Sequence, residues 1–492
     1  MRLPRAALRQ LPRQLQRLQT PIRLLPGRIW HRSYATTFVS ASDLEFGQPV
    51  HETHPHLLKA GEITPGITAQ EYADRRAKLA FSLPDGAVAV LVSAEVKFRS
   101  GAVFYPFRQE SNFLYLTGFS EPQSLAVIRK TGPAMDDYDF HLFCRPKDPA
   151  AEQWSGPWSG LRAAEDVFNA DAAGDVNKLA ALLPPLLRDA TRIYTDTPLN
   201  TPPPAPSPAA SLPAILASLP TTIPTASLAN ALNHQRAVKS PAEIALMRHA
   251  GAVSGRALTS AMRRPWRSER DLDAYLGYAF TNDGLSGPAY VPVVAGGPRG
   301  RMIHYTHNTA VLDQEETVLV DAGGEYGWYI TDITRVWPVG GKFTPPQREL
   351  YGAVLRAQRV GVGLCRASSG LSLDEVHRAV ERALQQELAG LGFDFGGRGA
   401  GDLMAVLFPH HVGHYIGLDV HDVPGYPRSV PLRTGHCVTI EPGVYVPDDE
   451  RFPERFRGLA VRIEDSVCVD DDGPVVLTPE AVKEVEDIEA LR

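Results

Sequence analysis

Four acidic residues and one histidine occupy positions where each could bind a metal ion. Asp321 ends the apolar run TVLV, Asp332 follows GWYI, Glu441 follows CVTI and Glu464 follows LAVRI. His414 stands between them in the sequence, in the segment HHVGHYIGLDVHDVP. A lone ionised carboxylate in an apolar strand is costly unless it is paired or bound to a cation. These residues therefore need a source of positive charge.

Four carboxylates and one imidazole favour two hard divalent cations, and Mn²⁺ is the metal that we expect. Carboxylates can bridge two ions held about 3.5–4 Å apart, and a water shared by the ions loses its proton near neutral pH. The predicted chemistry is hydrolysis by that hydroxide. The alternative is that each acid is a strand-end residue paired with an arginine or a turn amide, which is the commoner case for any one of them alone. Five such residues together favour the metal site.

Three further histidines could take part in this chemistry. His410 and His421 lie in the same segment as His414, and could also be ligands, but there is no HExxH motif of a zincin helix. A neutral imidazole beside a metal can also donate a hydrogen bond to a tetrahedral intermediate. His304, in RMIHYTHN, could line a pocket, although a lone histidine is more often structural or exposed. We assign no role to Asp419 and Asp422.

The elements that must position these residues alternate between helices and short strands, which predicts an α+β fold with antiparallel pairing. Ser240, Pro241 and Glu243 form a capping box at a helix start, so we place the beginning of the second domain at 236. The sequence predicts strands over 317–321, 328–334, 436–440 and 459–463, and helices over 345–368 and 372–391. Pairing of the first two strands would bring Asp321 and Asp332 together.

The first domain is predicted over 43–235. The segments 87–93, 113–119 and 139–145 have the composition of strands, and 163–187 is helix-like. The stretch 196–225 is rich in proline and serine, which predicts a long surface connection or an insertion.

Composition limits the class of protein further. The chain has 492 residues and a net charge of −6, which argues against a nucleic-acid-binding protein. No run approaches 18 consecutive apolar residues, so no transmembrane helix is expected. The four cysteines form no CxxC pair, which argues against a disulfide framework or a cysteine zinc site and fits a reducing compartment.

Residues 1–42 differ from the rest, because they contain eight arginines and no acidic residue. This arginine-rich, acid-free and amphipathic composition predicts a mitochondrial presequence. The alternative is a basic arm that binds nucleic acid or anionic lipid.

The second domain resembles the pita-bread (M24) metallopeptidases, the fold of aminopeptidase P, prolidase and methionine aminopeptidase. The resemblance rests on LVDAGGEYGWYITDITRVWP, HHVGHYIGLDVHDVP, TIEPGVYVPDD and RGLAVRIEDSVCV, in that order. Upstream, PFRQESNFLYLTGFSEP is similar to the α/β N-terminal domain of aminopeptidase P, in the mitochondrial branch that includes the intermediate cleaving peptidase. Methionine aminopeptidases lack that domain, and creatinase lacks the metal ligands.

The resemblance implies a role for each site residue. It implies that the five residues above are the metal ligands, with Asp332 and Glu464 bridging the two ions. It further implies that His304 and His421 contact the scissile carbonyl or its intermediate and that His410 lines the substrate pocket. Arg462 resembles the arginine beside the first aspartate, with Tyr445 as its neighbour.

The function implied is that of an aminopeptidase that removes one residue at a time from a peptide or protein with a free N-terminus. The mitochondrial branch implies trimming of Tyr, Phe or Leu after cleavage by the matrix processing peptidase. X-Pro aminopeptidase and prolidase activity are the alternatives, and a non-catalytic scaffold is disfavoured because the ligands are intact. The segment Arg32-Ser33-Tyr34-Ala35 also fits a substrate of these two cuts, which predicts self-processing.

The expected location is the mitochondrion, in the matrix or on the matrix face of the inner membrane. Peripheral membrane association and a nuclear location stay open. The resemblance implies a homodimer, and the net charge argues against a nucleic-acid partner.

Overall fold

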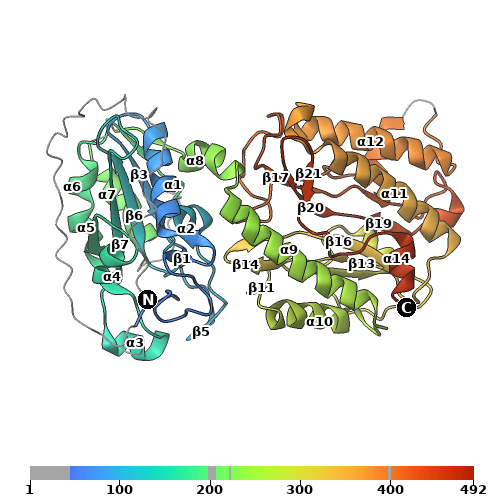
Figure 1. Ribbon diagram of the computed structural model, residues 1–492, viewed down its shortest axis with the longest axis horizontal. Coiled ribbons are helices and arrows are strands. Elements are labelled where there is room, and N and C mark those ends of the chain that lie inside the picture. Colours follow the sequence, from blue (N-terminus) through green and yellow to red (C-terminus); the bar gives the residue numbers. More distant parts are fainter. Residues whose placement is uncertain (1–44, 198–206, 221–222, 397–399) are drawn as a thin grey trace, which may run out of the picture. The chain divides into compact units, whose positions relative to one another are not determined.

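The computed structural model describes residues 45–492 except 198–206, 221–222 and 397–399. Glu45–Arg492 forms one compact unit, whose elements are labelled in Figure 1. The predicted presequence 1–42, with its Tyr34-Ala35 bond, lies outside the described residues. No helix in the described part of the chain is long and apolar enough to cross a membrane.

The N-terminal half of this unit is built on a six-stranded mixed sheet in the order β10-β9-β3-β6-β7-β8. The strands are β3 (Ala87–Val92), β6 (Leu125–Lys130), β7 (Tyr138–Cys144), β8 (Ala172–Asp175), β9 (Arg192–Tyr194) and β10 (Thr225–Ala226). Successive side chains of β3 face opposite sides of the sheet, so Val88 and Val90 belong to one apolar cluster while Ala89 and Leu91 belong to the other. Both faces are therefore buried.

Helices cover the two faces. One apolar cluster contains residues of α1 (Ala69–Ser82) and α2 (Ser111–Thr117), and the other contains residues of α5 (Leu179–Leu182), α6 (Pro184–Leu187) and α7 (Pro208–Ala217). The last of these helices comes from the proline-rich stretch 196–225, where Leu212 and Ile215 are buried. That stretch thus contributes a layer of the fold.

The prediction of a strand over 113–119 is wrong, because residues 113–117 belong to α2. The Glu110 side chain caps this helix by accepting hydrogen bonds from the N–H groups of Asn112 and Phe113, and Gly118 ends it with a φ of 67°. All residues from Phe113 to Thr117 are buried. A helix buried on every side shows no 3.6-residue pattern, and its aromatic content then favours the strand interpretation.

The helix expected over 163–187 is also interrupted. Helix α4 (Gly160–Asp166) ends early, strand β8 follows, and a 3₁₀ turn (Val176–Lys178) leads into α5. The strands predicted over 87–93 and 139–145 are confirmed as β3 and β7.

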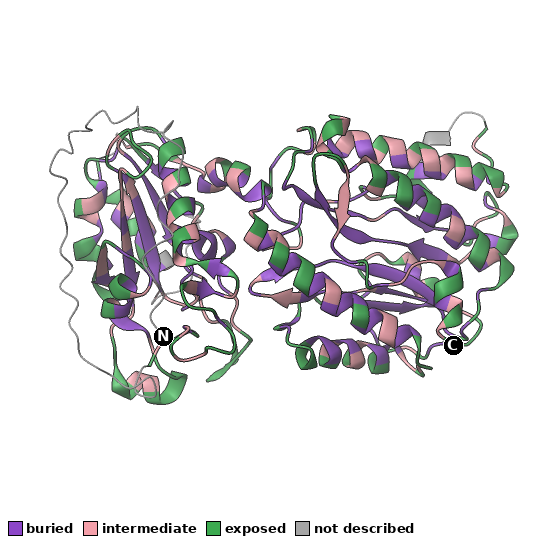
Figure 2. Ribbon diagram, viewed as in Figure 1, coloured by how far each residue is buried: buried purple, intermediate pink, exposed green. Residues whose placement is uncertain are grey.

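The C-terminal half contains four small antiparallel sheets. They are β12-β13-β16, β17-β20-β21, β18-β19 and β11-β14-β15. Their strands are β11 (Gly287–Pro288), β12 (Val293–Gly296), β13 (Thr317–Asp321), β14 (Gly324–Tyr326), β15 (Tyr329–Ile330), β16 (Thr334–Pro338), β17 (Cys437–Ile440), β18 (Gly443–Tyr445), β19 (Ala460–Arg462), β20 (Asp465–Val469) and β21 (Pro474–Val476). Figure 2 shows that most of these strands are buried.

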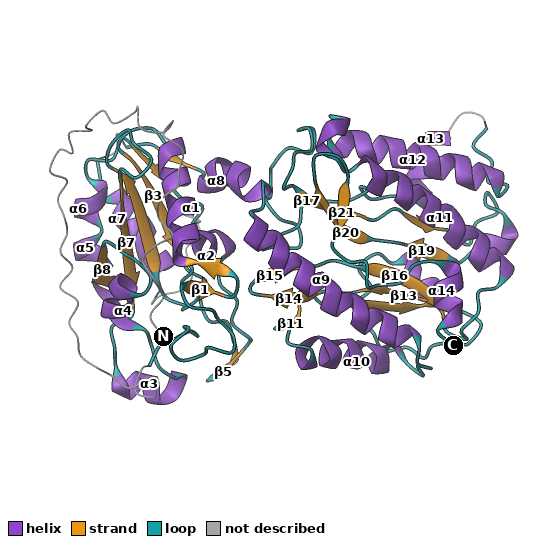
Figure 3. Ribbon diagram, in the orientation of Figure 1, coloured by secondary structure: helices purple, strands orange, loops and turns teal. Residues whose placement is uncertain are grey.

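Long helices flank these sheets (Figure 3). They are α9 (Pro241–Met262), α10 (Glu269–Asn282), α11 (Pro345–Leu364) and α12 (Leu373–Gly390), with the shorter α8 (Leu228–Ala237), α13 (Ala400–Leu407) and α14 (Val485–Ala490) beside them. Helix α9 opens with the predicted capping box, in which the Ser240 hydroxyl accepts from the Glu243 N–H. The predicted α+β class is confirmed, and so are the helices that became α11 and α12.

One predicted strand of this half is wrong. The segment 328–334 is two short strands, β15 and β16, with Thr331–Ile333 between them. Strand β13 pairs antiparallel with β16, which places Asp321 opposite Thr334. Asp332 consequently lies in the gap between two strands, where its side chain is not confined to one face of a sheet.

Candidate metal centre

All four acids stand where a strand of the C-terminal half ends or begins. Asp321 is the last residue of β13, Glu441 follows β17, and Glu464 lies between β19 and β20. The Glu464 N–H donates to the Thr334 carbonyl at 3.1 Å. This hydrogen bond connects the segment that carries Glu464 to the start of β16, two residues after Asp332. These positions let the carboxylates face one another while the strands remain in the core.

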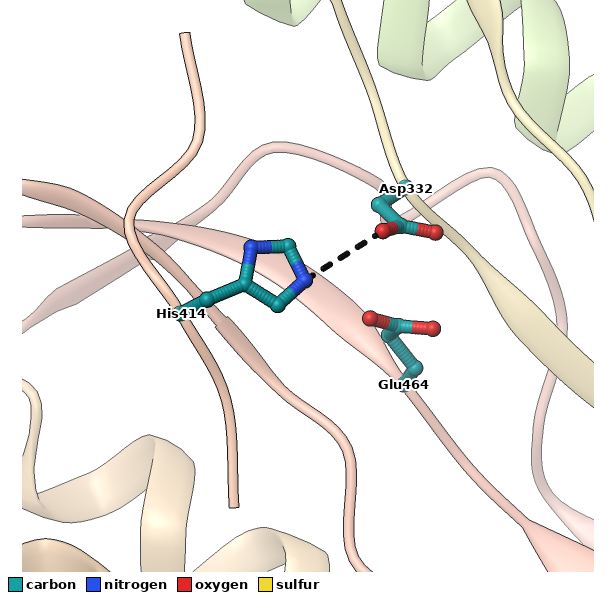
Figure 4. Close-up of side chains that lie close together, drawn as sticks. All are labelled: Asp332, His414 and Glu464. Carbon is teal, nitrogen blue, oxygen red and sulfur yellow. Dashed lines mark ion pairs between the residues drawn. The ribbon is translucent and has the colours of Figure 1, made fainter. Parts of the chain in front are cut away.

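The structure brings three of the expected residues into one group. Asp332, His414 and Glu464 each offer a ligand atom within 4.8 Å of the others, and Figure 4 shows the three side chains facing one another. His414 Nε2 lies 3.5 Å from Asp332 Oδ2 and 3.5 Å from Glu441 Oε1. Glu441 therefore reaches the group through the histidine.

Two hydrogen bonds on the side away from the carboxylates fix the orientation of His414. Its Nδ1 lies 3.1 Å from the Tyr415 carbonyl, to which it donates, and its backbone N–H donates to the Thr439 hydroxyl at 3.1 Å. The hydrogen bond at Nδ1 leaves Nε2 free to face the carboxylates. This is the arrangement that a metal-binding imidazole needs.

Asp321 is connected to the group by two side chains. Arg462 Nη2 donates to Asp321 Oδ2 at 2.6 Å, and the Tyr290 hydroxyl contacts Asp321 Oδ1 at 2.8 Å. The same Tyr290 hydroxyl donates to Asp332 Oδ1. Tyr290 thus links the two aspartates.

Three of the four carboxylates, those of Asp321, Glu441 and Glu464, are not neutralised by their neighbours. Burial, followed by the charge of Asp332, raises the pKa of Asp321 to about 7. Burial and the neighbouring acids Asp332 and Glu441 raise the pKa of Glu464 well above its usual value, and burial raises the pKa of Glu441. The guanidinium of Arg462 opposes these shifts without cancelling them. Additional positive charge would stabilise all three carboxylates.

Asp332 and His414 form an ion pair, with 3.5 Å between Oδ2 and Nε2. Burial alone would raise the pKa of Asp332, but the hydrogen bond and charge of His414 lower it. Burial alone would lower the pKa of His414, but Asp332 and Glu441 raise it to about 9. The protonated His414 ring lies between the carboxylates of Asp332 and Glu441 and supplies positive charge to both.

A buried oxygen without a partner also points to a metal. Glu464 Oε1 is buried and has no hydrogen-bond partner among the described residues, while Oε2 accepts from the Thr334 hydroxyl at 2.6 Å. An unpaired buried carboxylate oxygen is costly, and a cation would satisfy it. Four carboxylates with one imidazole suit hard divalent ions. The residues present fit a pair of such ions.

Two of the three other histidines lie beside the group. The ring centroids of His414 and His421 are 4.4 Å apart, and burial and the charge of His414 lower the pKa of His421. His410 Nε2 contacts the Tyr445 hydroxyl at 2.9 Å, and burial lowers the pKa of His410 to about 4. Both rings are thus held neutral, as hydrogen-bond donors or acceptors.

His304 is exposed in a turn that follows β12, and its charge contributes to the lowered pKa of His421. No hydrogen bond joins the His304 side chain to another described residue in the structure. Its imidazole is therefore free to meet a substrate.

Arg462 contacts both Asp321 and Tyr445. The Tyr445 hydroxyl accepts from Arg462 Nη1 at 2.9 Å, and Arg462 Nε donates to the Thr334 hydroxyl at 2.9 Å. One arginine thus contacts a tyrosine, a threonine and the first aspartate.

Sequence reasoning missed Tyr290 and Thr334. Tyr290 contacts two aspartates that are 31 and 42 positions away, and Thr334 contacts Glu464 130 positions away. Only the tyrosine in the segment GPAYVP before a predicted strand could have been noticed, and that signal is weak.

Asp422, to which we assigned no role, is an anchor of the histidine segment. It is buried and accepts from Lys239 Nζ at 2.8 Å and from the Arg236 guanidinium. These cations lower its pKa although burial alone would raise it. The anchor fixes the position of the adjacent His421.

Comparison with known proteins agrees with this geometry. A family model described as metallopeptidase family M24 matches residues 245–471, and one described as aminopeptidase P, N-terminal domain, matches 72–194. Intermediate cleaving peptidase 55 of Saccharomyces cerevisiae is 41% identical over 93% of this chain and 91% of its own length. Xaa-Pro aminopeptidase 3 of Mus musculus is 39% identical over 90% of each chain. A crystal structure of Icp55 from Saccharomyces cerevisiae has a TM-score of 0.81 at 40% identity, covering 88% of this chain and 99% of that one.

The chain belongs to metallopeptidase family M24, in the branch that carries an aminopeptidase P N-terminal domain. It is a metal-dependent aminopeptidase that hydrolyses peptides with a free N-terminus, and it groups with the intermediate cleaving peptidases and Xaa-Pro aminopeptidases. The resemblance stated from the sequence is confirmed.

Proposed function

We propose that the protein removes a single N-terminal Tyr, Phe or Leu from mitochondrial proteins that the matrix processing peptidase has already cut. Support comes from its similarity to proteins named intermediate cleaving peptidase 55 over more than nine-tenths of the chain. The observation that carries the hydrolytic chemistry is the buried, undercompensated carboxylate group with its unpartnered Glu464 oxygen.

Asp321, Asp332, His414, Glu441 and Glu464 would hold two Mn²⁺ ions. Such ions lower the pKa of water to near 7 and polarise a carbonyl oxygen. Asp332 and Glu464 lie at the centre of the group and would each serve both ions. Tyr290 and Arg462 hold the Asp321 carboxylate in place by hydrogen bonds, and this would fix its position as a metal ligand.

The remaining polar groups would act on the peptide. His421 and His304 would donate hydrogen bonds to the oxygen of the scissile carbonyl as negative charge develops on it. His410, held by Tyr445, would line the pocket that receives the peptide. The lowered pKa values of His410 and His421 keep these two imidazoles neutral, so each can donate from one nitrogen while accepting at the other.

A second candidate function is X-Pro aminopeptidase activity, which the name of the Mus musculus relative favours. Prolidase activity would need a closed pocket that recognises the carboxylate of a dipeptide. The same metal centre would serve all of these reactions, so the substrate pocket decides between them.

Three substrates assayed side by side with Mn²⁺ test the proposal. The expected order of kcat/KM is a peptide beginning Tyr-Ala first, an X-Pro-X peptide second and an X-Pro dipeptide last. Preference for X-Pro-X would replace the proposal with aminopeptidase P activity, and preference for the dipeptide would replace it with prolidase activity. Hydrolysis of none of them after metal loading would favour the scaffold.

His304→Ala tests the assignment of the histidine to the substrate. We expect a kcat about 100-fold lower with an unchanged metal content, because the side chain would contact only the reacting carbonyl. His307→Ala is the matched control, since His307 is exposed in the same segment. Loss of metal from the His304 variant would overturn the assignment.

We also infer a mitochondrial location, in the matrix or on the matrix face of the inner membrane, from the composition of 1–42 and from the relatives. Self-processing at Tyr34-Ala35 is part of this inference. Amino-terminal sequencing of the mature protein should find Ala35 first, and a chain beginning with Tyr34 would contradict self-processing. A homodimer is proposed by analogy, and sedimentation of the purified protein would test it.

A further inference from the structure

Two of the four cysteines face each other across neighbouring strands. Strands β17 and β20 pair antiparallel, in a register that places Cys437 directly opposite Cys468. The next pair of opposite residues, His436 and Val469, is hydrogen-bonded, with the Val469 N–H donating to the His436 carbonyl at 2.8 Å. Hydrogen-bonded and non-hydrogen-bonded pairs alternate, so the cysteines form a non-hydrogen-bonded pair.

That position suits a disulfide. Opposite residues in a non-hydrogen-bonded pair have Cα atoms about 4.5 Å apart and side chains on the same face of the sheet. A disulfide needs a Cα separation of about 4.4–6.8 Å. The strands therefore need no large shift for the two sulfurs to bond.

The electrostatics of the two thiols differ. Hydrogen bonding with Cys468 raises the pKa of Cys437 well above its usual value, and the same interaction lowers the pKa of Cys468. Cys437 is fully buried and Cys468 is 5% exposed. Cys468 is thus the more acidic thiol and the less completely buried of the two.

The two other cysteines provide an internal reference. Cys144 and Cys365 are also buried and free, and burial raises the pKa of each to about 12. Cys144 lies in β7 of the N-terminal half, and Cys365 follows α11, where its thiol donates to the Gly361 carbonyl at 3.4 Å.

We propose that Cys437 and Cys468 are a site of reversible oxidation, at which a peroxide forms a disulfide between β17 and β20. The Cys468 thiolate attacks one peroxide oxygen, the O–O bond breaks, and water leaves after protonation of the departing oxygen. The sulfur of Cys437 then displaces the hydroxyl of the sulfenic acid, which leaves as a second water with the Cys437 proton. Two thiols lose two electrons in total, and one peroxide gains them.

The crosslink ties together two strands that lead directly to the metal centre. Glu441 follows the last residue of β17, and Glu464 precedes the first residue of β20. A bond at the far end of this strand pair opposes separation of the strands, because it closes a loop in the unfolded chain and so lowers the conformational entropy gained on unfolding.

The experiment uses the full-length protein, loaded with Mn²⁺ and treated with hydrogen peroxide under non-reducing conditions. We expect the intact mass to fall by about 2 Da, the mass of the two hydrogens lost when one disulfide forms. Peptide mapping should place that bond between Cys437 and Cys468, with Cys144 and Cys365 still alkylatable. Dithiothreitol should restore all four thiols, and the thermal midpoint should be higher in the oxidised form.

The variants Cys468→Ala and Cys144→Ala sharpen the test. The first should show no loss of mass on peroxide treatment, and the second should behave as the wild type. An unchanged mass, oxygen addition without a disulfide, or a bond that involves Cys144 or Cys365 would each overturn the proposal. The wild-type map decides the question even if a variant fails to fold.

Discussion

Glu464 and Asp465 are neighbours in the sequence, and both are buried. The structure surrounds the Asp465 carboxylate with positive charge and hydrogen-bond donors, but gives the Glu464 carboxylate few partners. Asp465 accepts hydrogen bonds from Arg335 Nη2 at 2.6 Å, Gln358 Nε2 at 2.8 Å and the Thr478 hydroxyl at 2.8 Å, and it also contacts Lys483 Nζ. Glu464 accepts from one hydroxyl and leaves its other oxygen unpartnered.

The pKa values record this difference. Burial alone would raise the pKa of Asp465, but Arg335 and Lys483 outweigh it and hold that pKa below its usual value. For Glu464 burial and neighbouring acids act together, and the pKa rises well above its usual value. A fully compensated carboxylate is structural, whereas an undercompensated one needs a ligand.

Removal of the charge from Glu464 should have the largest effect on activity. We expect Glu464→Gln to lose at least about 1,000-fold in kcat/KM, which corresponds to about 4 kcal/mol, because a carboxylate that serves both ions is replaced by a poor ligand. Metal analysis should show a lower metal content while the fold is retained. Full metal content with full activity would contradict the metal centre.

Asp465→Asn should show the opposite pattern, with a large effect on stability. We expect a loss of about 3–5 kcal/mol in the free energy of unfolding, because the buried Arg335 and the partly buried Lys483 lose their counter-charge. Urea denaturation of the metal-loaded protein measures it, and the specific activity of the folded fraction should remain close to that of the wild type. Equal stability would show that this network is less important than its contacts indicate.

In metal-free protein, the pH dependence of the free energy of unfolding should distinguish the residues of the metal centre from Asp465. The folded-state pKa values of Asp321 (about 7) and His414 (about 9) are both raised above their unfolded values, so folding retains protons that the unfolded chain releases. Stability should therefore fall by several kcal/mol as the pH rises from 5 to 9. Asp465, with its lowered pKa, stays ionised throughout and contributes equally at every pH in this range.

Bound metal should reverse this trend, because metal binding releases protons from its ligands. Urea denaturation at pH 5.5, 7 and 8.5, with EDTA or with Mn²⁺, gives both curves. Metal-free protein that becomes more stable as the pH rises would contradict the electrostatics of the group.

Thr334→Val should have the smallest effect. The Thr334 hydroxyl joins Glu464 Oε2 to Arg462 Nε, and its removal leaves a second oxygen of Glu464 without a partner. We expect kcat/KM to fall about tenfold, or about 1–2 kcal/mol. Thr317→Val at the other end of the β13–β16 pair is the matched control, and an equal loss there would mean that the effect is not specific to Glu464.

Much of the fold could be predicted where the pattern of apolar residues is periodic. Helices α11 and α12 and strands β13, β17 and β19 lie close to their expected positions because each buries one face or runs through the core. Helix α2 could not be predicted, since every residue from Phe113 to Thr117 is buried and no polar face marks the helix. Asp332 could not be placed between strands for a similar reason, because the chain around it is continuously buried.

The candidate site residues could be named from the sequence, but the residues around them could not. The acids and histidines are visible as polar residues at the ends of apolar runs. Tyr290 and Thr334 have no such signal, because their contacts depend on strands that meet only in the folded chain. The pairing of Cys437 with Cys468 is hidden in the same way, since no CxxC spacing announces it.

The sequence by itself determined the family, the α+β class and which side chains could bind metal ions, because these follow from residue type, order and local periodicity. Only the tertiary structure decided that Asp465 receives a guanidinium from 130 positions away while Glu464, one residue earlier, receives none of its own. The physical reason is that the energy of a buried charge depends on its distance in space from other charges, and folding sets that distance.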